Sequence, residues 1–186
     1  MAKNKNNVVI KGMSGKFADM LVFSQRFGQT IVGKVPLRSG TSTAGQLAVR
    51  EKFSQATIYA VSAISDAATK KDYEDMAIPS QSAYNLAIAD FFNAPQILST
   101  DTAAYSGNIG GLIKVKAKDD FRVAKVTVII SKANGTVVEQ GDAVSTNGVD
   151  WVYTATIANS AYSGNKVKVQ VKDLPGNLTE AESTLA

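Results

Sequence analysis

Alternating apolar and polar positions dominate the second half of the chain and predict a series of short β-strands. Between residues 166 and 172, Val167, Val169 and Val171 alternate with Lys and Gln residues, which is the pattern of a strand with one buried face. Six further runs rich in strand-forming residues are 96–101, 109–118, 123–131, 136–140, 151–157 and 178–185. Seven short strands in succession, with turn residues between them, predict a β-sandwich.

Turn residues support this division. Asn134-Gly135 lies between two of the predicted strands, and this dipeptide favours a hairpin because both residues tolerate a positive φ. Pro175-Gly176-Asn177 precedes the last predicted strand and is typical of a turn. Trp151, on an alternating run, is expected in the core of the sandwich.

The first part of the chain predicts a small hairpin. The runs Met20–Phe23 and Thr30–Val35 are short and apolar, and Arg26-Phe27-Gly28 lies between them. Val8–Ile10 is a candidate for an additional strand. The segment Gly12–Lys16 has two interpretations, a glycine-rich turn that leads into the hairpin or an incomplete phosphate-binding loop.

Helical spacing begins after this hairpin. Thr43 and Gln46 fit a capping box, and apolar residues then recur at intervals of three and four, which predicts an amphipathic helix over 46–64. A short helix is expected over 69–76, and a third helix through Phe92 with Ser80 or Ser82 as its N-cap. Pro95 disfavours helix at the residue before it and places a domain boundary between residues 1–94 and 95–186.

The composition argues against several classes of enzyme. The chain of 186 residues is 45% hydrophobic and 19% charged, which is typical of a globular protein, and it has no Cys and no His. Disulfides, thiolate nucleophiles and Ser-His-Asp catalysis are therefore excluded. We expect a protein that is not an enzyme. No run is apolar enough for a transmembrane helix or a secretory signal, so we expect no membrane insertion and a location in the cytoplasm or in an assembled particle.

Positive charge is concentrated at the start of the chain. Residues 1–60 contain nine Lys and Arg residues and two acidic residues. The candidate contact residues for a nucleic acid or a protein partner are Lys11, Lys16, Arg26, Lys34, Arg38, Arg50 and Lys52. Phe residues are interleaved with them, which is compatible with phosphate contact and base stacking, or with an ordinary solvated surface around a Phe core.

Four aspartates form a candidate calcium site. Asp119, Asp120, Asp142 and Asp173 follow alternate strands, and alternate loops of a sandwich gather at one end. Converging carboxylates suit Ca²⁺, the one cofactor that the sequence suggests. The alternative is turn chemistry, in which Asp side chains accept hydrogen bonds from their own backbone.

Two resemblances to known families add context. Asp119-Asp120-Phe121, Trp151-Val152-Tyr153-Thr154 and the run 169–177 with its Asp-x-x-Gly-Asn ending resemble bacterial immunoglobulin-like (Ig-like) modules. The segments Gly12–Lys16, Lys34-Val35-Pro36 and Thr43–Phe53 resemble an uncharacterised bacterial family associated with phage-like genes. The first resemblance implies a fold and the second a genomic context, and neither implies catalytic residues.

The sequence thus predicts an α+β N-terminal domain, a β-hairpin with about three helices, followed by an all-β Ig-like sandwich of about seven strands. The favoured hypothesis for function is a structural or interaction protein, such as a phage-derived virion, tail or injection-system accessory, with a protein partner or a homo-oligomer. A nucleic-acid-binding module centred on residues 1–60 and a surface protein that binds carbohydrate or another ligand are the alternatives.

Overall fold

The protein consists of two compact units. The computed structural model describes residues 2–4, 7–36 and 40–185, and the units are Met1–Arg50 and Glu51–Ala186. The boundary that the sequence predicted, between residues 94 and 95, falls inside the second unit. Packing between the helices and the sandwich, described below, accounts for this difference.

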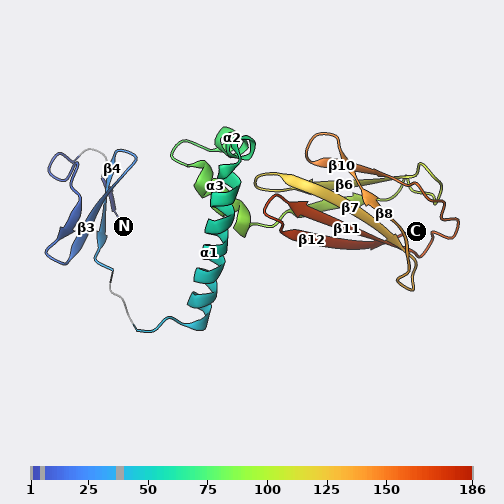
Figure 1. Ribbon diagram of the computed structural model, residues 1–186, viewed down its shortest axis with the longest axis horizontal. Coiled ribbons are helices and arrows are strands. Elements are labelled where there is room, and N and C mark those ends of the chain that lie inside the picture. The colour runs from blue at the N-terminus through green and yellow to red at the C-terminus, as the bar shows by residue number, and fades with distance from the viewer. Residues whose placement is uncertain (1, 5–6, 37–39, 186) are drawn as a thin grey trace. The chain divides into compact units, whose positions relative to one another are not determined.

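The first unit contains an antiparallel sheet of four short strands, with the order β1-β4-β3-β2 (Figure 1). The strands are β1 (Ala2–Asn4), β2 (Gly15–Phe17), β3 (Leu21–Arg26) and β4 (Gln29–Lys34). The predicted hairpin is confirmed, because β3 and β4 pair from Leu21↔Lys34 to Arg26↔Gln29. The suggested strand at Val8–Ile10 is wrong, since these residues form a turn instead. Gly12–Lys16 leads into β2 and β3 rather than into a helix, so the segment lacks the structural context of a phosphate-binding loop.

Three helices follow, and the caps predicted for the first and the third of them are present. In α1 (Ala44–Ser65), the backbone N–H of Thr43 donates to Gln46 and the N–H of Gln46 donates to the Thr43 hydroxyl, which completes the capping box. The α2 helix (Ala67–Met76) has Asp66 as its N-cap, and α3 (Ala83–Phe92) has Ser82 rather than Ser80. None of the helices in the described ranges is long and apolar enough to cross a membrane.

The remainder of the second unit consists of two four-stranded antiparallel sheets (Figure 1). One has the order β5-β6-β10-β9 and the other β12-β11-β7-β8. The bounds are β5 (Gln96–Asp101), β6 (Leu112–Lys118), β7 (Val123–Ser131), β8 (Val137–Asp142), β9 (Val144–Ser145), β10 (Asp150–Thr154), β11 (Lys166–Asp173) and β12 (Leu178–Thr184). All seven predicted strands are present, and the two-residue strand β9 is an addition.

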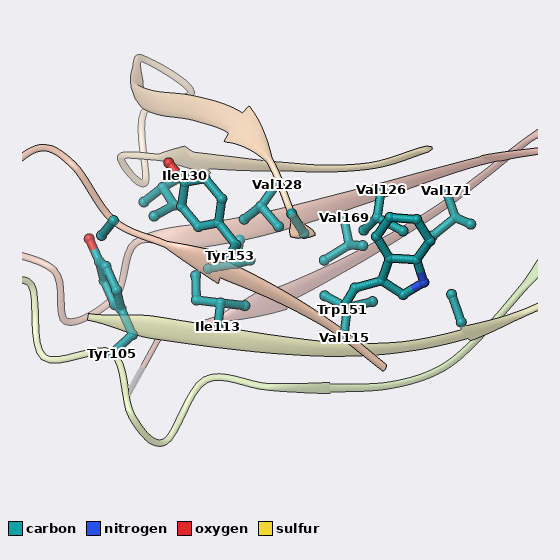
Figure 2. Packing of buried hydrophobic residues seen from close by; sticks show 14 of the residues in the cluster. Tyr105, Ile113, Val115, Val126, Val128, Ile130, Trp151, Tyr153, Val169 and Val171 are labelled. Carbon is teal, nitrogen blue, oxygen red and sulfur yellow. The ribbon is translucent and has the colours of Figure 1, made fainter. Parts of the chain in front are cut away.

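The alternating residues of both sheets point into one core, as a β-sandwich requires. Val167, Val169 and Val171 of β11 are at most 1% exposed, and the Lys and Gln residues between them are more exposed. Figure 2 shows Trp151 of β10 beside Val126 and Val171 of the opposite sheet. The prediction that Trp151 is a core residue is confirmed, since its side chain is 8% exposed.

A second, smaller core joins the helices to the sandwich. Tyr73 of α2 stacks on Phe121 of the β6–β7 loop, with ring centroids 4.0 Å apart. Ala60 of α1 and Ala87 of α3 are fully buried in the same cluster. Helices α2 and α3, and α1 from Glu51 onward, therefore belong to the same compact unit as the sandwich.

Candidate functional site

Three carboxylates from distant parts of the chain meet where α3 joins the sandwich. Asp90 lies in the last turn of α3, Asp119 follows β6, and Asp173 ends β11. One carboxylate oxygen from each lies within 4.8 Å of the others. Asp90 and Asp173 are each 2% exposed, and Asp119 is half-buried. We refer to these three residues as the aspartate cluster.

Asp90 is held by a chain of hydroxyl groups. The Tyr73 hydroxyl donates to Asp90 Oδ2 over 2.6 Å, and the Tyr59 hydroxyl lies 2.9 Å from the Tyr73 oxygen. Because Tyr73 uses its proton on Asp90, Tyr59 must be the donor between the two tyrosines. The second oxygen of Asp90, Oδ1, is buried and has no hydrogen-bond partner among the described residues.

Asp173 is held by the turn that follows it. Its Oδ1 accepts the backbone N–H groups of Gly176 and Asn177, and its Oδ2 accepts the Asn177 side-chain amide over 2.7 Å. The same amide faces the backbone carbonyls of Asp90, Phe91 and Asn93, over 3.4, 3.2 and 3.1 Å. The Asp-x-x-Gly-Asn sequence thus closes a turn and also ties the end of α3 to the sandwich.

Asp119 completes the cluster from the β6–β7 loop. Its Oδ2 accepts the backbone N–H of Arg122 over 3.1 Å, while its Oδ1 is buried and, like that of Asp90, has no partner among the described residues. In the described parts of the chain, no member of the cluster forms an ion pair with Lys or Arg. The cluster therefore concentrates negative charge in a largely buried place.

The protonation of the cluster reflects this environment. The pKa of Asp90 is raised to about 7, chiefly by burial and also by the neighbouring carboxyl groups of Asp119 and Asp173. The hydrogen bond from Tyr73 opposes this rise. Burial also raises the pKa of Asp173, although its hydrogen bonds from Asn177 and Gly176 oppose this. Both shifts mean that negative charge is unfavourable here without an added positive group.

The predicted calcium set is divided by the structure. Asp119 and Asp173 come together, whereas Asp142 pairs with Lys125 at 3.0 Å and accepts the Thr127 hydroxyl. Asp120 is exposed and accepts the Asn93 side-chain amide. Asp90 was not predicted from the sequence, because a single Asp in an apolar helix gives no sign of which loops it faces.

The candidate basic residues are spread over several surfaces. Lys16 and Arg26 lie on one face of the N-terminal sheet and Lys34 on the other, because paired residues point the same way and neighbours in a strand alternate. Lys11 lies in an exposed turn, and Arg50 is exposed on α1. Lys52, also on α1, lies 5.1 Å from the centre of the Phe92 ring of α3. Arg38 lies outside the described residues.

Comparisons with known proteins give no family for the chain. No family model matches, and no curated protein matches. Among solved structures, similarity is found to CopC from Methylosinus trichosporium OB3b, with 17% identity, a TM-score of 0.36, and coverage of 47% of this chain and 87% of CopC. An engineered protein matches with 16% identity and a TM-score of 0.37 over 59% of this chain and 28% of its own length. A lipoprotein from Bacteroides thetaiotaomicron matches with 13% identity and a TM-score of 0.28, over 50% of this chain and 78% of the lipoprotein.

Proposed function

We propose that the protein is a non-enzymatic interaction protein that docks on another protein through its N-terminal unit. The observation that carries this proposal is the near absence of a core in that unit. Among its described residues, Ile31 is the one buried hydrophobic side chain, and neither of the two hydrophobic clusters includes a residue before 51.

A small sheet is stabilised by covering an apolar face, and this unit has several uncovered apolar side chains, one in strand β2 and the others in the turns. Phe17, Met20 and Phe27 are 59%, 65% and 71% exposed, and Val8 and Val9 are exposed still further. Sheets of this size need packing against another layer for stability. A partner surface that supplies this layer would bury these side chains, at about 25 cal/mol for each Å² of apolar area.

Phe27 gives independent support, because its backbone is unfavourable for its side chain. It occupies the tip of the β3–β4 hairpin with φ of 49°, and Gly28 follows with φ of 72°. Asn, Asp and Gly adopt this left-handed conformation far more readily than Phe. An exposed aromatic side chain at a position that costs backbone energy supports a role in contact rather than in folding.

The charge of the unit favours an acidic partner. Residues 1–50 contain eight Lys and Arg residues and one acidic residue, Asp19. Such a partner would present acidic groups around an apolar centre, which is a common arrangement of protein interfaces. A second copy of this chain would meet the same positive charge and is disfavoured on that ground.

The finer form of the proposal places the protein in a phage-derived particle, tail or injection system, with an Ig-like domain displayed. The strand orders β5-β6-β10-β9 and β12-β11-β7-β8 correspond to the ABED and GFCC′ sheets of immunoglobulin domains, which supports the Ig-like interpretation. The phage context rests on the sequence resemblance alone.

Nucleic-acid binding is the second candidate, supported by Lys16 and Arg26 on one sheet face. It requires affinity to fall steeply with salt concentration, because phosphate contacts release counterions. A protein interface with a buried apolar centre predicts a weak dependence on salt. A ligand-binding role of the sandwich loops has no comparable support in the geometry.

The Phe27→Asn variant separates folding from docking. Asn suits the left-handed turn, so the hairpin should become slightly more stable, whereas docking should weaken at least tenfold if Phe27 is a central contact. The partner is recovered from the native host with nuclease treatment, and its affinity for both proteins is measured by calorimetry at two salt concentrations. Val144→Asn is the matched control, since Val144 is 72% exposed in the second unit.

Three outcomes would contradict the proposal. Unchanged affinity of the Phe27→Asn variant would show that the hairpin tip is not part of the interface. Partners that disappear after nuclease treatment would support the nucleic-acid alternative. Concentration-dependent dimerisation by sedimentation, with no other partner bound, would identify a second copy of the chain as the occupant.

A further inference from the structure

Two buried carboxylate oxygens in the aspartate cluster have no donor among the described residues other than a proton shared between the Asp90 and Asp119 carboxyl groups. Oδ1 of Asp90 and Oδ1 of Asp119 have no hydrogen-bond partner among the described residues, and Asp90 is 2% exposed. The other oxygen of each residue is already bound, to Tyr73 and to the backbone of Arg122 respectively. An unpaired buried acceptor is costly, and two that belong to neighbouring carboxyl groups are costlier because ionisation of both would place like charges side by side.

No Lys or Arg of the described residues forms an ion pair with this cluster. In the described ranges, the nearby Arg122 side chain pairs with Asp72 instead, at 3.0 Å. Asp173 adds a third carboxylate within the same 4.8 Å. Like charges at this distance in a buried place require a cation or a bound proton between them.

We propose that Asp90, Asp119 and Asp173 bind Ca²⁺ and that the ion ties α3 to the sandwich. Carboxylate oxygens are the ligands that Ca²⁺ prefers, at about 2.3–2.6 Å, so two ligands of one ion are separated by about 5 Å at most. The observed span of 4.8 Å satisfies this limit before any adjustment of side chains. The chain has no His and no Cys, which leaves a purely oxygen-based site that suits Ca²⁺ better than zinc or copper.

The position of the cluster gives the ion a structural role. Asp90 belongs to a helix, and Asp119 and Asp173 belong to the two sheets' ends. An ion bound by all three would join these elements at the point where the Asn177 amide already contacts α3. The half-buried Asp119 leaves an approach from solvent, through which the ion could enter and water could complete its coordination. This inference concerns the second unit and is independent of the docking proposal.

The test uses the full chain after treatment with a chelator. Terbium, which replaces Ca²⁺ and emits when a nearby aromatic ring is excited, is titrated into the protein with excitation of tyrosine. Tyr73 contacts Asp90 directly, so emission should rise with saturable binding and fall when Ca²⁺ displaces the terbium. Ca²⁺ should also raise the melting temperature, with half-saturation between about 10⁻⁵ and 10⁻³ M, and Mg²⁺ should have a smaller effect because it demands a stricter geometry.

Two variants test two of the three proposed ligands, and two further variants serve as controls. In Asp90→Asn and in Asp119→Asn, half-saturation of the terbium emission should require at least a tenfold higher concentration of terbium. The thermal shift should likewise require at least a tenfold higher concentration of Ca²⁺. Asp120→Asn and Asp142→Asn are the matched controls, because both are aspartates outside the cluster, and they should retain the full response.

Two results would overturn the proposal. Absence of terbium binding to the native protein, with a melting temperature that 10 mM Ca²⁺ does not change, would show that a shared proton neutralises the cluster. A response that survives in both Asp90→Asn and Asp119→Asn, or that disappears in Asp142→Asn, would place the ion elsewhere. The native titration needs no variant, so the proposal remains testable if Asp90→Asn fails to fold.

Discussion

The two units of this protein are built from the same kind of β-strand and differ in what covers it. In β11 of the second unit, three valines are at most 1% exposed because a second sheet lies over them. In β3 of the first unit, the four residues from Leu21 to Ser24 are all half-buried, on both faces alike. A strand pattern therefore specifies the hydrogen-bonded ladder, whereas stability depends on the layer that packs against it.

This difference separates folding from function. The second unit has a sandwich core and a helix–sandwich core, and both are closed by side chains of the same chain. Both units expose some large apolar side chains, such as Val144 in the second unit, but in the described part of the first unit Ile31 is the one hydrophobic side chain that is buried. A sheet with so little buried apolar area gains stability when another surface covers it.

The largest expected effect comes from removing equivalent side chains from the two units. Ile113→Ala, in the sandwich core, should lower the free energy of unfolding by about 2–5 kcal/mol, because Ile113 is fully buried. Ile31→Ala should leave the main transition almost unchanged. Urea unfolding followed by tryptophan fluorescence checks this, since Trp151 is the only Trp and lies in the sandwich core. Equal losses in the two variants would show that the units unfold together.

A pH dependence of a few kcal/mol is the next effect, and it belongs to the second unit. The pKa of Asp90 is about 7 in the folded protein, and its ordinary value is 3.8. Between pH 3.8 and pH 7, the Asp90 carboxyl is therefore protonated in the folded state and ionised in the unfolded state. The free energy of unfolding should therefore fall as pH rises from 5 to 7, by about 1.4 kcal/mol for each pH unit, and level off above pH 7.

The measurement is a series of urea unfolding curves in the presence of a chelator. With no histidine in the chain, few other side chains titrate in this range. Carboxyl groups with lowered pKa values, such as Asp142 beside Lys125, titrate below this pH range. Their contribution to the free energy of unfolding is lost only when the pH falls below the range. Asp90→Asn should flatten the slope, and an equal slope in that variant would assign the effect to another group.

A smaller effect should follow from cutting the polar link between helix and sandwich. Asn177→Ala removes the amide that faces three carbonyls at the end of α3, and the expected cost is about 1–3 kcal/mol. Hydrogen exchange at the α3 amides should increase more than at β7. Asn108→Ala is the control, because the amide of Asn108 makes one local contact, to Ser106. Equal exchange at α3 in both variants would contradict the role of Asn177.

The sequence predicted the local structure well, since its signals are local. The capping box at Thr43, the hairpin around Phe27 and the alternation in β11 each depend on residues a few positions apart. Val8–Ile10 shows the limit of this reasoning, because three apolar residues form a turn when no neighbouring strand pairs with them.

Contacts between distant residues were outside the reach of the sequence. The stacking of Tyr73 on Phe121 and the link from Asn177 to α3 join residues that are 48 and more than 80 positions apart, and they place the helices in the unit of the sandwich. The aspartate cluster also depends on contacts between distant residues. Topology brought Asp119 and Asp173 together, as alternate loops suggested, whereas Asp90 came from a helix that the sequence assigned to another domain.

The smallest expected effect comes from removing the N-caps of two helices. A comparison of the two variants tests where the boundary between the units lies. Asp66 accepts the backbone N–H of Thr69 over 2.8 Å at the start of α2, and Asp66→Ala should cost about 1 kcal/mol. Thr43→Ala removes an equivalent cap from α1, whose first residues, Ala44–Arg50, belong to the first unit. The loss in Asp66→Ala should therefore appear in the unfolding transition that Trp151 reports. The loss in Thr43→Ala should appear instead as faster hydrogen exchange in the first turns of α1, without a shift of that transition. A shift of similar size in both variants would extend the cooperative unit through α1 to its N-terminus.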